Sequence, residues 1–309
     1  PFNGSDGQKF PRGTLVLPVK NQKQSPEAIH NLLSGICEEF GLTAHGLTTG
    51  LDYQGKSLGS PSMASVKKPK IALLVGNGVS SYEAGEIWHL LDQRMKMPVT
   101  LLETNRVASA NLARYNTIIM VNGSYNTLGE SGKNKLKQWL EAGGNVIAVK
   151  RAMSYLNSNG MGNFKFKKTA DDTLETNKLY KDISADRGAQ QLGGSIFEAT
   201  IDPSHPLLFG YYGNRVAIFK NDRLFLENSK NAFANPVRYT DNPLIGGYIS
   251  NPTLELLKGS SVIGVSRVGA GRVIGLTADM NFRAFWYGTN RIFLNALFFG
   301  PVISRSSMR

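Results

Sequence analysis

Residues 70–81 read KIALLVGNGVSS, residues 117–123 read TIIMVNG and residues 145–153 read NVIAVKRAM, and these three stretches decide the fold. In each, a short apolar run ends at glycine or polar residues and leads toward a helical pattern. Near-continuous apolar runs of this length are typical of strands that are buried on both faces of a parallel sheet. Their alternation with amphipathic helices predicts an α/β fold.

The alternation continues through residues 67–309, which we predict to be one domain. We expect three layers, in which a mostly parallel, flavodoxin-like sheet lies between helices, together with a β-rich C-terminal part. In that part, residues 262–268 and 272–277 predict a hairpin, and residues 292–299 predict a last helix. The other expected elements are strands at Ile71–Val75, Val99–Glu103, Thr117–Val121 and Val146–Val149, and helices at Tyr82–Met95 and Leu128–Ala142.

Residues 1–66 are expected to form a separate strand-helix-strand connector that ends in a linker. Its helix is well marked, because Ser25 is a favourable N-cap and Gly41 a favourable terminator. The linker is rich in Ser and Pro from Gly59 onward. The expected elements are a helix at Pro26–Phe40 and strands at Thr14–Val19 and Thr43–Gly50.

The composition excludes several classes of protein. With 309 residues and 41% hydrophobic content the chain can bury a full core, and no apolar run reaches the roughly 18 residues that a membrane helix requires. The net charge of +12 is spread over short clusters without a recognition motif, so we expect no nucleic-acid binding. The single cysteine, Cys37, excludes an internal disulfide, and we expect it to be buried on the apolar side of its helix.

Four polar residues follow or end the expected parallel strands, where open α/β sheets bind ligands. With Gly76 and Gly78 they approximate a dinucleotide-binding fingerprint. However, the charge of Glu83 in the first helical turn would oppose a pyrophosphate, and Ser80 and Glu83 have the spacing of a capping box. We therefore expect no cofactor and keep the four residues as weak candidates for binding another small ligand: Asn77, Ser80, Glu103 and Asn122.

The chain offers no strong catalytic or metal-binding motif. His89 and Asp92 are one helical turn apart on a polar face, which favours a solvated surface over a metal site. Ser124 follows the third strand without an obvious base, so a degenerate hydrolase is the weakest hypothesis. The densest polar and aromatic cluster lies between residues 279 and 287. We interpret it as a packed corner in which Asp279 pairs with Arg283, and a binding surface is the alternative.

The order of several motifs resembles that of one known region. The motifs are Gly76–Leu91, Gly193–Phe197, Asp202–Gly210 with its His205-Pro206-Leu207, and Asp279–Asn295. In this order they resemble the C-terminal, class I glutamine-amidotransferase-like region of large zinc carboxypeptidases, the carboxypeptidase A-like metallopeptidases common in Bacteroidetes. The resemblance covers most of the chain, including Gly13–Ser60, which looks like the connector after the peptidase domain.

The resemblance also reveals two missing sites. An amidotransferase carries a Gly-x-Cys-x-Gly elbow after the fourth strand, whereas here Val149 is followed by Lys150 and Arg151. The zinc site of the peptidase family, His-x-x-Glu with a later His, and its catalytic glutamate cannot be placed on this chain. The resemblance therefore implies a piece of a longer, secreted or periplasmic peptidase without its catalytic domain, and Pro1 in place of a methionine agrees with this interpretation.

These observations favour a non-catalytic accessory domain that scaffolds, contacts or oligomerises a zinc metallocarboxypeptidase. The expected partner is the catalytic domain of the same polypeptide, and a second copy of the chain is the alternative partner. Zinc is implied only for the missing domain. The second hypothesis is a small-molecule-binding domain with its ligand at the carboxyl ends of the strands, and the third is the degenerate hydrolase.

Overall fold

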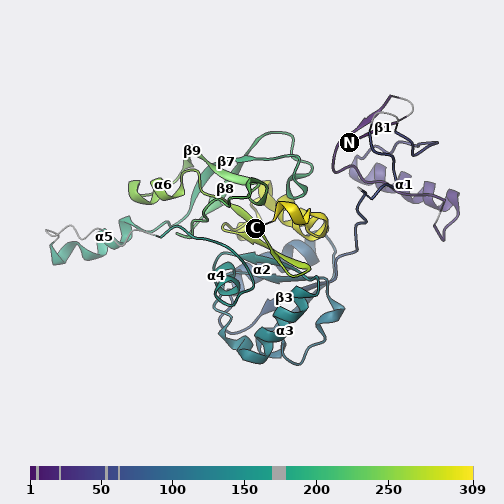
Figure 1. Cartoon of the computed structure of the whole chain (residues 1–309). Helices are drawn as coiled ribbons and strands as arrows, with labels where there is room; N and C mark the ends of the chain where they lie inside the picture. The colour runs from purple at the N-terminus through teal and green to yellow at the C-terminus, as the bar shows by residue number, and fades with distance from the viewer. Residues whose placement is uncertain (5–6, 21, 53–54, 62, 169–178, 309) are drawn as a thin grey trace. The chain divides into compact units, whose positions relative to one another are not determined.

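The computed structural model describes residues 1–4, 7–20, 22–52, 55–61, 63–168 and 179–308. The chain divides into two compact units, Pro1–Ser65 and Val66–Arg309 (Figure 1). In the first unit, β1 (Phe2–Asn3) pairs antiparallel with β2 (Lys9–Phe10), and α1 spans Pro26–Phe40.

The helix of the first unit is confirmed, but its two expected strands are wrong. Ser25 Oγ accepts a hydrogen bond from the Ala28 backbone N at 3.2 Å, and Gly41 ends α1 in the left-handed conformation. Residues 14–19 and 43–50 form no strand. They find no partner strand within the unit, so apolar side chains such as Leu15 stay exposed. Cys37 is half-buried, less than predicted.

The second unit is built on a six-stranded sheet in the order β10-β11-β6-β5-β3-β4. Five of these strands are parallel, and β10 is antiparallel to β11 at one edge. Taken in chain order, the parallel strands have the 2-1-3-4-5 arrangement of flavodoxin-like folds, which confirms the predicted fold class. The strands are β3 (Ile71–Val75), β4 (Val99–Glu103), β5 (Thr117–Met120), β6 (Asn145–Val149), β10 (Ile263–Val268) and β11 (Gly271–Leu276).

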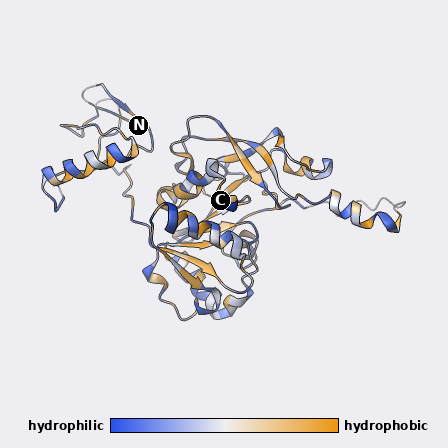
Figure 2. Ribbon diagram, turned by 180° about the vertical axis from the view of Figure 1, so that it is seen from behind, coloured by the Kyte–Doolittle hydropathy of each residue, from blue (hydrophilic) through white to orange (hydrophobic). Residues whose placement is uncertain are grey.

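Alternate residues of the strands enter two separate apolar cores, because successive side chains of a strand point to opposite faces. Leu73 and Ile147 pack with α2 (Ser81–Trp88) and α7 (Asn290–Phe298), whereas Leu74 and Val146 pack with α3 (Gly129–Glu141) and α4 (Arg151–Ser158). Helices therefore cover both faces and make three layers, and the strands are largely apolar (Figure 2). A π-helical segment, His89–Arg94, continues α2.

The β-rich part adds a three-stranded antiparallel sheet, β8-β7-β9, whose side chains join the same core as α2 and α7. Its strands are β7 (Ser195–Ile201), β8 (Arg215–Lys220) and β9 (Val237–Gly246), and the helices of this region are α5 (Ile183–Ala189) and α6 (Asn251–Leu257). The predicted hairpin and last helix are confirmed as β10-β11 and α7.

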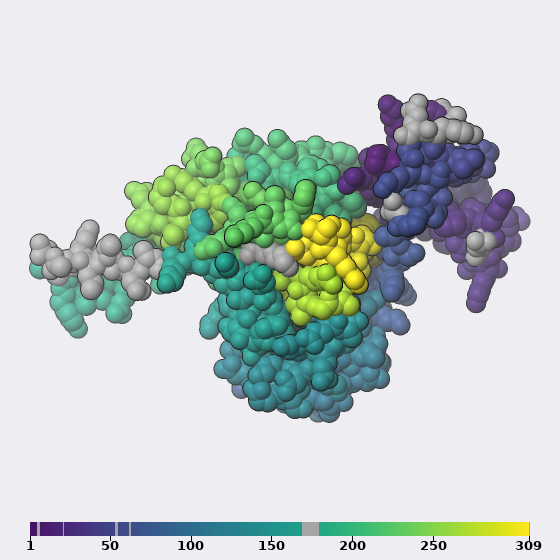
Figure 3. All heavy atoms as spheres, viewed as in Figure 1, coloured from purple at the N-terminus to yellow at the C-terminus, as the bar shows by residue number. Residues whose placement is uncertain are grey.

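The C-terminal residues pack on the second unit and are yellow in Figure 3. The Arg272 guanidinium donates to the Gly300 carbonyl at 2.6 Å, and Ile303 is buried. None of the described helices combines the length and the hydropathy that crossing a bilayer would require.

Candidate functional site

The turn after β6 has the geometry of a nucleophile elbow, but a lysine occupies it. Lys150 lies between β6 and α4, with φ of 50° and ψ of −120°. Residues other than glycine rarely adopt positive φ, and such strained positions persist where the surrounding structure holds them. In α/β enzymes a strained strand-to-helix turn of this kind exposes the catalytic nucleophile. Here the turn is retained and the nucleophile is absent.

The amine of Lys150 is locked in a buried ion pair. Its Nζ lies 2.9 Å from Glu83 Oε1 and 2.8 Å from Asn221 Oδ1, and its side chain is only 4% exposed. Burial by itself would lower the pKa of Lys150, but the Glu83 carboxylate outweighs this effect and the pKa is raised. Lys150 is therefore a charged ammonium without a free electron pair, which makes it unsuited to nucleophilic attack.

Glu83 connects three strand ends through its carboxylate. It lies in the first turn of α2, and its Oε2 accepts a hydrogen bond from the Asn122 backbone N at 3.1 Å. Ser80 Oγ accepts from the Glu83 backbone N at 3.3 Å, so the predicted N-cap is confirmed. The reciprocal half of the capping box is wrong: the Ser80 backbone N donates instead to the Asn122 carbonyl, because the Glu83 carboxylate is turned toward Lys150.

The structure places the four predicted ligand residues in different surroundings. The Ser80 and Asn122 loops lie together beside Glu83, and Asn122 Oδ1 accepts from the Arg151 backbone N at 3.4 Å. Asn77 is exposed, and its carbonyl accepts from Thr127 Oγ1 at 3.2 Å. Glu103 is exposed at the end of β4 and lies 3.9 Å from Arg106. The side-chain oxygens of Ser80 and Asn122 are thus already used within the protein.

A second buried lysine supports the site from β8. Lys220 is fully buried, and its Nζ donates to Asp222 Oδ1, the Leu224 carbonyl and the Thr277 carbonyl at 2.7, 2.9 and 2.8 Å. These three acceptors match the three protons of an ammonium group. Glu83, Lys150, Asn221 and Lys220 were all missed as site residues. The one available signal was the placement of each lysine at the end of an apolar strand.

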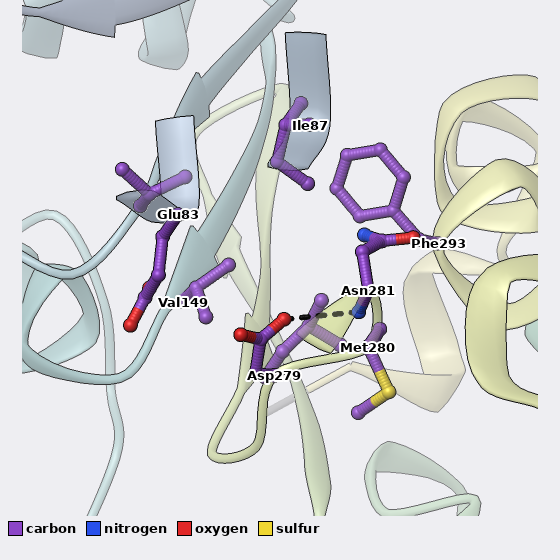
Figure 4. A pocket seen from close by; sticks show the side chains of 9 residues that line it. Glu83, Ile87, Val149, Asp279, Met280, Asn281 and Phe293 are labelled. Carbon is purple, nitrogen blue, oxygen red and sulfur yellow. Dashed lines mark hydrogen bonds between the residues drawn. The ribbon is translucent and has the colours of Figure 1, made fainter. Parts of the chain in front are cut away.

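The cavity beside this ion pair is too small for a substrate. It has room for about one water molecule. Figure 4 shows Glu83 on one side and Asp279 on the other, with the hydrogen bond that the Asn281 backbone N donates to Asp279 Oδ1 at 2.9 Å. The remaining lining is mostly apolar: Ile87, Val121, Val149, Leu276, Met280 and Phe293.

The predicted ion pair between Asp279 and Arg283 is wrong. The Arg283 guanidinium instead lies 5.2 Å from the centre of the Phe282 ring, while its backbone N donates to Glu86 Oε1 at 2.7 Å. The corner is nevertheless packed, since Phe282 stacks on Phe219 with ring centres 3.7 Å apart. Exposed aromatic side chains, Phe285 and Tyr287, lie in the same segment.

A larger, polar groove opens next to the elbow. Its volume is about 490 Å³. Ser124 lines this groove, but no described histidine or carboxylate is hydrogen-bonded to its Oγ, which leaves a hydrolase without a base. Within the described ranges, no group of three or more His, Cys, Asp or Glu residues is arranged to hold a metal ion. The groove is lined by Gly123, Ser124, Asn126, Gly129, Glu130, Lys133, Arg151, Ser154, Tyr155, Ser158 and Asn159.

Comparison with known proteins finds similarity in solved structures only. No family model and no curated protein matches the chain. PurLQS from Thermotoga maritima is 13% identical, with a TM-score of 0.48 over 75% of this chain and 98% of that chain. A putative ThuA-like protein from Bacteroides uniformis is 13% identical, with a TM-score of 0.47 over 80% and 96%. A putative GMP synthase protein from Thermoplasma acidophilum is 10% identical, with a TM-score of 0.44 over 75% and 94%.

The fold is glutamine-amidotransferase-like. The strand order and the elbow after β6 carry this statement, and the similarities are too distant to add a function. Nothing in them bears on a carboxypeptidase, so that part of the resemblance stays a prediction.

Proposed function

We propose that this chain is a non-catalytic accessory domain that acts by contact, scaffolding or oligomerising the catalytic domain of a zinc metallocarboxypeptidase. The observation that supports the non-catalytic part is Lys150, which occupies the elbow and is held by Glu83 and Asn221. The adjacent cavity, with room for about one water, agrees with it. The identity of the partner rests on the motif order in the sequence.

Hydrolysis assays test the non-catalytic part. We expect the purified chain to release no ammonia from glutamine and to cleave neither esters nor C-terminal residues of peptides, with or without added zinc. Any activity should be unchanged in Lys150→Met, because the amine is not a nucleophile. Peptide cleavage that a chelator abolishes would contradict the proposal.

The partner part needs a separate experiment. The reading frame upstream of Pro1 should encode a signal peptide and a domain with a His-x-x-Glu zinc site. If it does, the two parts produced as separate chains should associate in sedimentation velocity. A reading frame without such a domain would remove the peptidase partner and leave the non-catalytic interpretation standing.

The groove favours a second candidate function, the binding of a small polar molecule. Its volume of about 490 Å³ lies within the range of typical ligand sites. Ser124, Ser154, Ser158, Asn126 and Asn159 provide hydroxyl and amide groups for hydrogen bonds. This place differs from the predicted one, since of the strand-end loops only the residues after Asn122 contribute.

Thermal-shift screening tests this second candidate. Nucleotides, amino acids and sugars are added separately, and a ligand at about 100 times its dissociation constant should stabilise the fold by about 2.7 kcal/mol. Ser154→Trp, which fills the groove, should abolish the shift, whereas Ser184→Trp on the exposed side of α5 should not. A shift that survives Ser154→Trp would place the ligand elsewhere.

A further inference from the structure

Two acidic side chains meet where the segment 279–287 packs on α2. Glu86 is a half-buried residue of α2, and Asp279, which follows β11, is only 6% exposed. Glu86 Oε1 accepts from the Arg283 backbone N at 2.7 Å, and Asp279 Oδ1 accepts from the Asn281 backbone N at 2.9 Å. The Glu86 side chain and Asp279 are within hydrogen-bonding reach of each other.

This contact requires a proton. Two ionised carboxylates contain acceptors only, so neither could donate to the other. In that state Glu86 Oε2 is buried without any hydrogen-bond partner. One proton on Glu86 supplies the missing donor and removes the repulsion between two like charges. We propose that Glu86 and Asp279 share one proton, and that this proton fastens the segment 279–287 to α2.

The surrounding charges favour the protonated pair. Burial, the hydrogen bond with Asp279 and the charge of Asp279 together raise the pKa of Glu86 to about 8, and the Arg283 backbone N opposes this rise. Glu83 on the same helix adds a further negative charge. The nearest cation, Lys150 after β6, is already paired with Glu83 and is also attracted by Asp222 after β8.

The fastened segment carries strain and exposed aromatic residues. Arg283 and Ala284 both have positive φ, 49° and 57°, which a chain adopts only when its contacts hold it. Phe285 and Tyr287 are 57% and 61% exposed, and the Arg94 guanidinium lies 4.2 Å from the centre of the Tyr287 ring. Loss of the proton would release the strained residues, and the aromatic surface would lose its fixed shape.

The sign of the pH effect follows from the direction of the shift. The pKa of Glu86 is about 8 in the folded chain and about 4.3 in an unfolded one. The pair therefore stabilises the fold fully below about pH 4, and this stabilisation is lost as the pH rises toward 8. Across that window the folded chain holds up to one more proton than the unfolded chain.

Carboxyl NMR and amide exchange test the shared proton on the whole chain. We expect the Glu86 carboxyl carbon to titrate near pH 8, and the Arg283 amide to lose protection from exchange over the same range. In Glu86→Gln the amide group can donate to Asp279 without a proton. Its melting temperature should therefore exceed that of the wild type by several degrees at pH 9, and its Arg283 amide should stay protected.

Glu141→Gln, on the exposed side of α3, is the matched control and should leave both signals unchanged. The wild-type titration does not depend on any variant, so it decides the question even if Glu86→Gln folds poorly. A Glu86 carboxyl that titrates near pH 4, or an Arg283 amide equally protected at pH 6 and pH 9, would overturn the proposal.

Discussion

At the scale of single residues, Lys150 combines strain with a buried charge, and its replacement is the sharpest test of that combination. Lys150→Met leaves the Glu83 carboxylate, which is 13% exposed, without its cation. Removal of one partner from a buried ion pair destabilises a protein by about 3–5 kcal/mol. Urea denaturation should show a loss of this size in the free energy of unfolding.

Lys133→Met provides the comparison, because Lys133 pairs with the exposed Glu130 at 2.6 Å. We expect a loss of at most about 1 kcal/mol there. Glu83→Gln combined with Lys150→Met should recover part of the loss of the single Lys150 variant, since no unpaired charge remains. Equal losses for Lys150→Met and Lys133→Met would show that the buried pair contributes no more than a surface pair.

At the scale of elements, two glycines should respond oppositely to the same added methyl group. Gly271 begins β11, and a Cβ there would lie 1.9 Å from the Leu140 carbonyl oxygen and 2.5 Å from that of Gly144. Both are backbone atoms that cannot turn aside. Gly271→Ala should therefore lower the free energy of unfolding by at least about 3 kcal/mol, as measured by chemical denaturation.

Gly85 lies inside α2, where a Cβ would meet nothing within 4 Å. Gly85→Ala should raise the free energy of unfolding by about 0.5–1 kcal/mol, because alanine loses less backbone entropy in a helix. Destabilisation by Gly85→Ala would indicate that the exposed face of α2 contacts something in solution.

At the scale of the whole molecule, the net charge of +12 is dispersed instead of forming a nucleic-acid-binding face. Of the cluster Lys165, Lys167 and Lys168, the Nζ of Lys167 is occupied by the carbonyls of Leu256 and Lys258 at 2.7 and 3.3 Å. That lysine supports the end of α6 and is not free to bind phosphate.

We therefore expect only weak, sequence-independent binding to a DNA duplex. Fluorescence anisotropy should detect it at about 50 mM salt and no longer at about 200 mM, because counterion release dominates such binding. Binding that depends on sequence and survives the higher salt would contradict this prediction and would indicate a defined basic surface.

The sheet could be predicted from sequence because its signals are local. The strands at residues 71–75 and 99–103 match the structure, since a continuous apolar run has one stable place in such a fold. The same logic failed at residues 14–19 and 43–50. Apolar residues alone do not make a strand when no neighbouring strand is present to pair with them.

The sequence by itself determined the α/β architecture, the helix that begins after Ser25 and the absence of a cysteine at the elbow. Only the tertiary structure decided what Lys150 does. Its partners, Glu83 and Asn221, are 67 and 71 residues away along the chain. They meet because β3 and β6 lie in one parallel sheet and β8 packs into the same core. Such a pairing depends on long-range packing, which local sequence patterns do not record.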